Sequence, residues 1–231
     1  MNRAVSRLTG GVGLAVLLLS SLLMAGLAAQ DKPKKKAQKK KVPAAMKPVK
    51  DVPGLPRVLL IGDSISIGYT VGVRELLSGK ANVHRPLTNC GPTTKGVKEL
   101  DKWLGDNPWD VIHFNWGLHD LKYLGTDGKS LAVPKSPGSR QQVPIQQYEK
   151  NLRQLVVRLK KTGATLIWRS TTPVPPGAKG RVVGDALKYN AVAASVMKEN
   201  GIAIDDMYVF AKTRLKQIQR PADVHFTSDG P

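Results

Sequence analysis

The chain of 231 residues has little of several features on which other protein classes depend. Its one cysteine, Cys90, excludes an internal disulfide and any metal site built from several cysteines. Aromatic residues make up only 5% of the chain, and no apolar run reaches the roughly 20 residues that a firm membrane span needs. Hydrophobic residues nevertheless make up 41% of the chain, which is enough for a folded core and excludes wholesale disorder.

Acidic residues are also scarce, since 17 Asp and Glu stand against 36 Lys and Arg, for a formal net charge of +19. Residues 1–52 carry 11 of the basic residues and 2 of the acidic ones, so half of the excess lies in a short N-terminal portion. A charge of this size suggests nucleic-acid binding, but the chain has no motif that reads bases. We therefore expect no specific nucleic-acid partner and interpret the charge of the folded part as a solvated basic surface.

Residues 1–29 have the pattern of a secretory signal peptide. Two arginines precede an apolar run that small residues follow: Arg3, Arg7, Val12 to Ala25, Gly26, Ala28 and Ala29. The pattern predicts a secreted or periplasmic protein. The alternative is a retained segment that anchors the chain in the inner membrane, although the run is short for a span.

Residues 30–55 form a Lys- and Pro-rich segment in which nine lysines lie between Lys32 and Lys50. Like charges repel one another along such a chain, and it has too few large apolar residues to bury, so we predict a disordered linker. One interpretation of Lys32–Lys50 is contact with an anionic polymer or surface. The alternative is a plain solvated linker.

Residues 56–231 alternate short apolar runs with amphipathic stretches. This alternation predicts an α/β fold, a single-domain three-layer α/β/α sandwich around a parallel sheet. Two polar loops, 125–143 and 173–181, are expected to wall a site at one edge of that sheet. The expected strands are 58–61, 81–84, 109–114, 165–168 and 202–204, and the expected helices are 71–77, 94–104, 145–161, 185–200 and 209–218.

Polar residues collect where the predicted strands end, which is where ligands bind in parallel sheets. They supply a hydroxyl, imidazoles, acids, and amide or glycine donors, which are the parts of a nucleophile, a base, an orienting acid and an oxyanion hole. Taken alone, the serine could instead be a helix N-cap. The residues are Asp63, Ser64, Asn89, Gly91, Asn115, His119, Asp120, Asp223 and His225.

Four motifs in this set resemble the SGNH (GDSL-type) hydrolases. They are G-D-S at 62–64, the Asn/Gly turn at 89–91, G-x-H-D at 117–120 and D-V-H-F-T at 223–227. T-T-P-V-P at 171–175 and Lys188-Tyr189-Asn190 resemble the bacterial secreted branch of that family. The resemblance implies a flavodoxin-like fold and a serine esterase without metal or cofactor, with Ser64 as nucleophile and His225 as base.

The sequence departs from the family pattern at two site positions. The family places the orienting acid three residues before the histidine, where this chain has Ala222, so we expect Asp223 to replace it. The implied oxyanion donors are the N–H groups of Ser64 and Gly91 and an Asn side chain, whose position His119 takes. Asn115 is the other candidate for that third donor.

The predicted function is a secreted serine esterase or acylhydrolase that cleaves carboxylic esters. The resemblance and the predicted export favour O-acyl groups on carbohydrates as the substrate, and a lipid or a simple aryl ester is the alternative substrate. The alternative is a non-catalytic protein that binds polyanions or polysaccharides on a degenerate hydrolase scaffold. Family members continue beyond the position of Pro231 with a helix that packs on the sheet. The resemblance therefore implies that this helix is missing from the sequence and that stability or activity is low.

Overall fold

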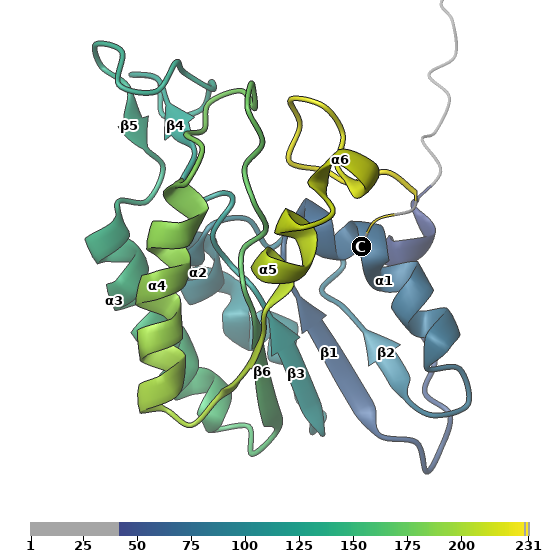
Figure 1. The fold of residues 1–231 in the computed structure, drawn as a ribbon. Coiled ribbons are helices and arrows are strands. Elements are labelled where there is room, and N and C mark those ends of the chain that lie inside the picture. The colour runs from purple at the N-terminus through teal and green to yellow at the C-terminus, as the bar shows by residue number, and fades with distance from the viewer. Residues whose placement is uncertain (1–41, 229, 231) are drawn as a thin grey trace, which may run out of the picture. The chain divides into compact units, whose positions relative to one another are not determined.

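The computed structural model describes residues 42–228 and residue 230, and a parallel sheet lies at its centre (Figure 1). Its strands are β1 (Arg57–Ile61), β2 (Asn82–His84), β3 (Val111–Phe114), β6 (Thr165–Arg169) and β7 (Ala203–Asp205), in the order β2-β1-β3-β6-β7. Val58 of β1 pairs with Val111 of β3, which in turn pairs with Thr165 of β6. The predicted signal peptide and the predicted linker up to residue 41 lie outside the described residues.

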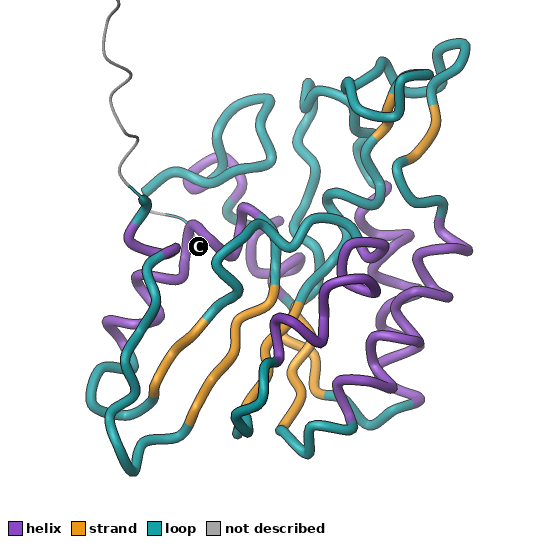
Figure 2. The backbone as a smooth tube through the Cα atoms, turned by 180° about the vertical axis from the view of Figure 1, so that it is seen from behind, coloured by secondary structure: helices purple, strands orange, loops and turns teal. Residues whose placement is uncertain are grey.

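Helices cover both faces of this sheet (Figures 1 and 2). They are α1 (Ser64–Leu76), α2 (Thr93–Leu104), α3 (Ile145–Lys160), α4 (Asp185–Glu199), α5 (Met207–Lys212) and α6 (Leu215–Ile218). On one side α3 packs between α2 and α4, and on the other side α1 packs against the sheet. Side chains alternate along a strand, so Leu59 and Ile61 enter the core while Leu60 faces α1. The three-layer α/β/α sandwich is thereby confirmed.

Two helices differ from their predictions. Helix α1 begins at Ser64 and not at Val71, because Asp63 caps its N-terminus and overrides the weak helix propensity of Gly68 within it. The predicted helix over 209–218 is divided into α5 and α6. There Thr213 Oγ1 and Arg214 Nη1 both donate to the carbonyl of Phe210, and such side-chain bonds compete with the helical ladder.

Residues before the predicted boundary at residue 56 have a defined structure from residue 42 onward. Residues Ala44–Met46 form a short 3-10 helix, η1, which packs against α1 and buries Ala45. Asn82 exchanges two hydrogen bonds with the backbone of Val52, at 2.9 and 3.0 Å. The prediction of disorder is therefore wrong for residues 42–55. This segment has few apolar side chains, and hydrogen bonds such as those with Asn82 hold it in place instead.

The polar loop predicted over 125–143 contains part of a small antiparallel ribbon. Its strands are β4 (Tyr123–Leu124) and β5 (Arg140–Gln141), and Leu124 also forms a bridge with Leu131. This ribbon projects beyond the carboxyl ends of the central strands (Figure 1). Among the described residues, no helix has the length and apolar character needed to cross a bilayer.

The face of the sheet under α1 carries polar side chains inside an apolar cavity of about 440 Å³. Arg169 is 1% exposed and stacks on the ring of Tyr69 at 4.8 Å, and its Nε and Nη1 atoms have no hydrogen-bond partner among the described residues. His113 is paired at Nε2 with Asp205 at 3.1 Å. Its Nδ1 atom lacks a partner within residues 42–228 and 230.

Candidate active site

Ser64 is the first residue of α1 and directly follows the turn that ends β1. The helix cap is Asp63, whose Oδ1 accepts the N–H of Ile65 at 3.0 Å. A cap role for Ser64 itself is therefore ruled out, and its hydroxyl is left for other contacts. As the first helical residue, Ser64 also has a backbone N–H without an intrahelical acceptor, at the positive end of the helix dipole.

A glycine is required immediately before this turn. A Cβ atom on Gly62 would lie 2.9 Å from Cβ of Ser66, which is closer than real Cβ contacts come. In the G-D-S sequence, Gly62 thus lets the backbone pass close to the Ser66 side chain and Asp63 caps the helix. The Ser64 hydroxyl is not used for capping.

The hydroxyl of Ser64 contacts an imidazole that is 161 positions away in the sequence, since its Oγ lies 2.7 Å from Nε2 of His225. The other ring nitrogen, Nδ1, lies 2.7 Å from Oδ1 of Asp223. A carboxylate only accepts hydrogen bonds, so Nδ1 carries the proton and Nε2 is left to accept the hydroxyl proton of Ser64. The three side chains thus form one contact series, which is the geometry that a nucleophile, a base and an orienting acid require.

Backbone pairing brings His225 back to the sheet edge. The segment after α6 turns so that Gln219 forms a bridge with Phe226, and the N–H of Arg220 donates to the carbonyl of His225 at 3.0 Å. The N–H of Thr227 donates to the carbonyl of Ile218 at 2.8 Å. This narrow loop holds the imidazole beside the turn that carries Ser64.

The carboxylate of Asp223 stays ionised in this arrangement. Burial on its own raises the pKa of Asp223, but hydrogen bonds from the ring and the backbone N–H of His225 outweigh it and leave the pKa below its usual value. An ionised Asp223 can hold the ring and stabilise it when it becomes protonated.

These residues open into a cavity of about 600 Å³. Both loops predicted to wall the site do so, Leu131 from the first and Ala178, Lys179 and Arg181 from the second. Asn89 and His119 lie on its wall together with Ser64, Asp223 and His225.

The oxyanion donors expected from the sequence differ in their availability. The ring of His119 lines the cavity. The N–H of Gly91 donates to Oδ1 of Asn89 at 2.9 Å, so it becomes free only when the Asn89 side chain turns away. Asn115 is wrong as a candidate, because it is 2% exposed and both hydrogens of its amide are used. They bind the carbonyl of Arg169 at 2.7 Å and Oγ1 of Thr171 at 3.2 Å, and so tie β3 to β6.

Arg85 supports the site without lining it, and sequence reasoning missed it. It is 4% exposed, and its guanidinium donates to the carbonyl of Gly62 at 3.4 Å and to that of Thr88 at 3.2 Å. It also donates to Oγ of Ser66 and Oγ1 of Thr70, both at 3.2 Å. Arg85 therefore links the turn before Ser64 to the loop that carries Asn89. A single Arg after a short strand has no pattern that distinguishes it from a surface charge.

Two other titratable groups near the site have different roles. Burial raises the pKa of the Cys90 thiol to about 11, so it stays protonated and is a poor nucleophile. Asp120 is fully buried and accepts hydrogen bonds from Thr93 at the start of α2.

Within residues 42–228 and 230, no three His, Cys, Asp or Glu side chains are grouped so that they could hold a metal ion.

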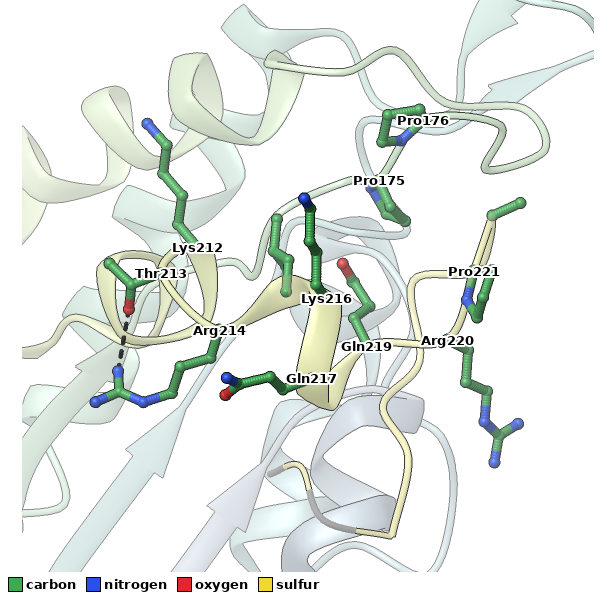
Figure 3. A pocket seen from close by; sticks show the side chains of 12 residues that line it. Pro175, Pro176, Lys212, Thr213, Arg214, Lys216, Gln217, Gln219, Arg220 and Pro221 are labelled. Carbon is green, nitrogen blue, oxygen red and sulfur yellow. Dashed lines mark hydrogen bonds between the residues drawn. The ribbon is translucent and has the colours of Figure 1, made fainter.

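A wider hollow of about 800 Å³ adjoins this cavity, with which it shares Ala222 (Figure 3). It lies beside α6, and four basic residues line it together with Pro175, Pro176 and polar side chains. The basic residues are Lys212, Arg214, Lys216 and Arg220. This hollow contains neither Ser64 nor His225, so its larger volume does not make it the reactive site.

The fold of the chain is similar to that of several solved structures. An acetyl xylan esterase, AlAXEase, superposes with a TM-score of 0.59 at 15% identity, over 75% of this chain and 92% of that chain. Axe2, an acetylxylan esterase from Geobacillus stearothermophilus, gives 0.58 at 16% identity, over 76% and 88%. LAE5, an alpha/beta hydrolase enzyme from the metagenome of Lake Arreo, Spain, gives 0.58 at 16% identity, over 76% and 89%. No family model and no curated protein matches the sequence. The chain has an SGNH hydrolase-like fold, as its sequence motifs imply.

Proposed function

We propose that this protein is a serine esterase that hydrolyses carboxylic esters. The observation that supports it best is the contact series from Ser64 to His225 to Asp223, with both distances at 2.7 Å, on the wall of an open cavity. The similarity in fold to enzymes named as esterases supports the same reaction class.

In the first half of the reaction, Oγ of Ser64 attacks the ester carbonyl carbon and its proton passes to Nε2 of His225. The carbonyl oxygen becomes an oxyanion, which the N–H of Ser64 and the ring N–H of His119 stabilise. The bond to the alcohol oxygen then breaks, and His225 returns the proton to that oxygen. An acyl group remains on Ser64.

In the second half, a water molecule gives a proton to His225 and attacks the acyl carbon. The bond to Ser64 breaks, the proton returns to Oγ, and the carboxylic acid leaves. Asp223 keeps Nδ1 protonated throughout and stabilises the imidazolium that forms twice per turnover.

For the substrate we propose a short acyl group on a carbohydrate hydroxyl. The solved structures of similar fold include proteins named acetyl xylan esterases, and the cavity of about 600 Å³ is open enough for a sugar beside the acyl group. The predicted signal peptide would place the enzyme outside the cytoplasm, where such polysaccharides occur. N-terminal sequencing of the mature protein tests export, and an intact Met1 in a membrane fraction contradicts it.

Hydrolysis of p-nitrophenyl acetate tests the reaction. We expect Ser64→Ala and His225→Ala each to lower kcat by about 10⁴-fold or more, because each removes one member of the relay. Ser195→Ala, on the exposed side of α4, is the matched control and should retain the wild-type rate. Equal rates in all four proteins would reject the esterase.

A second candidate function is binding of polyanions without catalysis, and the hollow lined by Lys212, Arg214, Lys216 and Arg220 favours it (Figure 3). It predicts that the protein binds polygalacturonate more tightly than neutral xylan and releases it as salt is added. Exchange of Lys212 and Lys216 for Gln should weaken that binding, whereas the same exchange at Lys102 and Lys150 should not. An affinity that does not change with salt concentration, or an equal affinity for both polymers, contradicts this function.

A further inference from the structure

In the sequence pattern of the SGNH hydrolases that this chain resembles, His119 takes the position of an Asn whose amide donates to the oxyanion, and an imidazole can do the same only in one of its forms. A neutral imidazole carries its single proton on either Nδ1 or Nε2, and the other nitrogen is an acceptor. An acceptor facing the oxyanion would repel it. The usefulness of His119 as a donor therefore depends on what controls its tautomer.

Lys122 makes the contact that determines which ring nitrogen of His119 carries the proton. Its Nζ atom lies 3.4 Å from Nδ1 of His119, from a position three residues further along the same turn. An ammonium group has three donors and no acceptor, so Nδ1 must accept and cannot carry a proton. The backbone of Lys122 is held in turn by the N–H of Gln142, which donates to the Lys122 carbonyl at 2.7 Å.

The ring of His119 is also kept neutral. Burial, opposed by the carboxylate of Asp63 and reinforced by the cations Lys122, Arg181 and Lys95, lowers the pKa of His119 to about 4. With the ring neutral at pH 7 and Nδ1 accepting from Lys122, the proton lies on Nε2. Within the described part of the chain, Nε2 makes no hydrogen bond and remains available to a ligand in the cavity.

We propose that Lys122 is a positioning residue, which holds His119 in the tautomer with Nε2 protonated and so makes the ring a donor to the oxyanion. Its consequence for catalysis rests on the proposed esterase function, whereas the tautomer itself does not. Lys122 touches no reacting atom and acts only through His119.

Three variants of the full chain separate this role from a structural one. Lys122→Glu replaces a donor with an acceptor, which draws the proton to Nδ1 and turns Nε2 toward the oxyanion as an acceptor. We expect kcat to fall by about 10²–10³-fold, the loss of one oxyanion donor, with KM nearly unchanged. Lys122→Arg keeps a donor and should retain most of kcat, and Lys122→Met should fall between the two. Lys150→Glu, on the exposed side of α3, makes the same change in net charge and should keep the wild-type kcat.

The ring nitrogens can be observed without any reaction. The chain has four histidines, so 15N-histidine labelling and long-range 1H–15N NMR resolve each ring, and His119→Gln assigns the one in question. We expect a protonated Nε2 and an unprotonated Nδ1 for His119 at pH 7 in the wild type, and the reverse in Lys122→Glu.

A wild-type ring protonated at Nδ1, or a Lys122→Glu ring that keeps the wild-type tautomer, would overturn the proposal. A reversed tautomer with an unchanged kcat in Lys122→Glu would also overturn it, since His119 would then not donate in catalysis. If the wild type hydrolyses no ester, the esterase fails while the NMR experiment still decides whether Lys122 sets the tautomer.

Discussion

Oδ1 of Asp223 accepts two hydrogen bonds from His225, one from ring Nδ1 at 2.7 Å and one from the backbone N–H at 3.2 Å. The second bond is an Asx turn, in which a carboxylate binds the N–H two residues further on. Because this turn directs the carboxylate toward the residue two positions further on, an acid two positions before the histidine reaches the ring. Ala222, at the position three residues before, has a positive φ of 53°.

Asp223→Asn should lower kcat by about 10²–10⁴-fold with little change in KM. The amide can rotate its NH₂ group toward the ring, which favours a proton on Nε2 and removes the acceptor that Ser64 needs. Steady-state hydrolysis of p-nitrophenyl acetate measures the effect. An Asp223→Asn enzyme with wild-type kcat would show that the ring needs no orienting acid.

Two replacements of Ala222, by Gly and by Val, should change the free energy of unfolding in opposite directions. The left-handed backbone conformation costs a residue with a Cβ atom about 1–2 kcal/mol. Glycine does not have this cost, but its greater conformational entropy in the unfolded chain offsets part of the gain. We expect Ala222→Gly to be neutral or stabilising by up to about 1 kcal/mol, and Ala222→Val to destabilise, since β-branched side chains tolerate this region worst. Urea unfolding compares the two, and a Val variant as stable as the Gly variant contradicts the assigned conformation.

Arg85→Met should destabilise the fold by about 3–5 kcal/mol, because hydroxyl and carbonyl acceptors within the fold lose their donor. Since Arg85 links the turn at Gly62 to the carbonyl of Thr88, kcat should also fall in the fraction that remains folded. Urea unfolding and esterase assays at low temperature measure both quantities. Arg153→Met, at an exposed ion pair on α3, should have little effect on either, and equal losses in the two variants would contradict this role.

Asp120 should make stability fall as pH rises. Burial raises its pKa to about 7 even though Thr93 donates two hydrogen bonds to it, and its Oδ2 atom has no partner among the described residues. The pKa of an Asp carboxyl in the unfolded chain is about 4. Between that pH and pH 7 the folded state keeps a proton that the unfolded state releases, so the free energy of unfolding decreases as pH rises.

Asp120→Asn cannot titrate, so the Tm difference between wild type and variant should shift in favour of the variant from pH 5 to pH 8. Differential scanning fluorimetry at half-unit steps measures this. A difference that stays constant with pH would show that Asp120 is ionised in the folded protein.

Predictions from the sequence succeeded where one local pattern decides the outcome. Helix α3, predicted over 145–161, runs from Ile145 to Lys160, because its apolar residues repeat with helical spacing. The parallel sheet followed from strands apolar enough to be buried on both faces. Ser64 and His225, whose motifs follow predicted elements in the right order, lie in contact although nothing local joins them, and their catalytic roles stay predictions.

The failures share a different cause. Asn115 had the right chemistry and the right place at a strand end, but its amide turns to Arg169 and Thr171 on the neighbouring strand. The N–H of Gly91, which the resemblance implies as an oxyanion donor, donates to Asn89 in this structure. Arg85 and the proposed positioning residue Lys122 carry no motif at all. Each of these depends on which of several partners a side chain finds in three dimensions.

The order of residues alone determined that the chain alternates buried strands with amphipathic helices and that a hydroxyl, an imidazole and an acid follow such elements. Only the tertiary structure decided that Ser64 and His225 touch, that Asp223 reaches the ring of His225, and that Lys122 lies beside Nδ1 of His119. Periodicity and capping act over a few residues and can be read directly. Hydrogen-bond partners are chosen by distances of a few ångströms between segments that packing alone brings together.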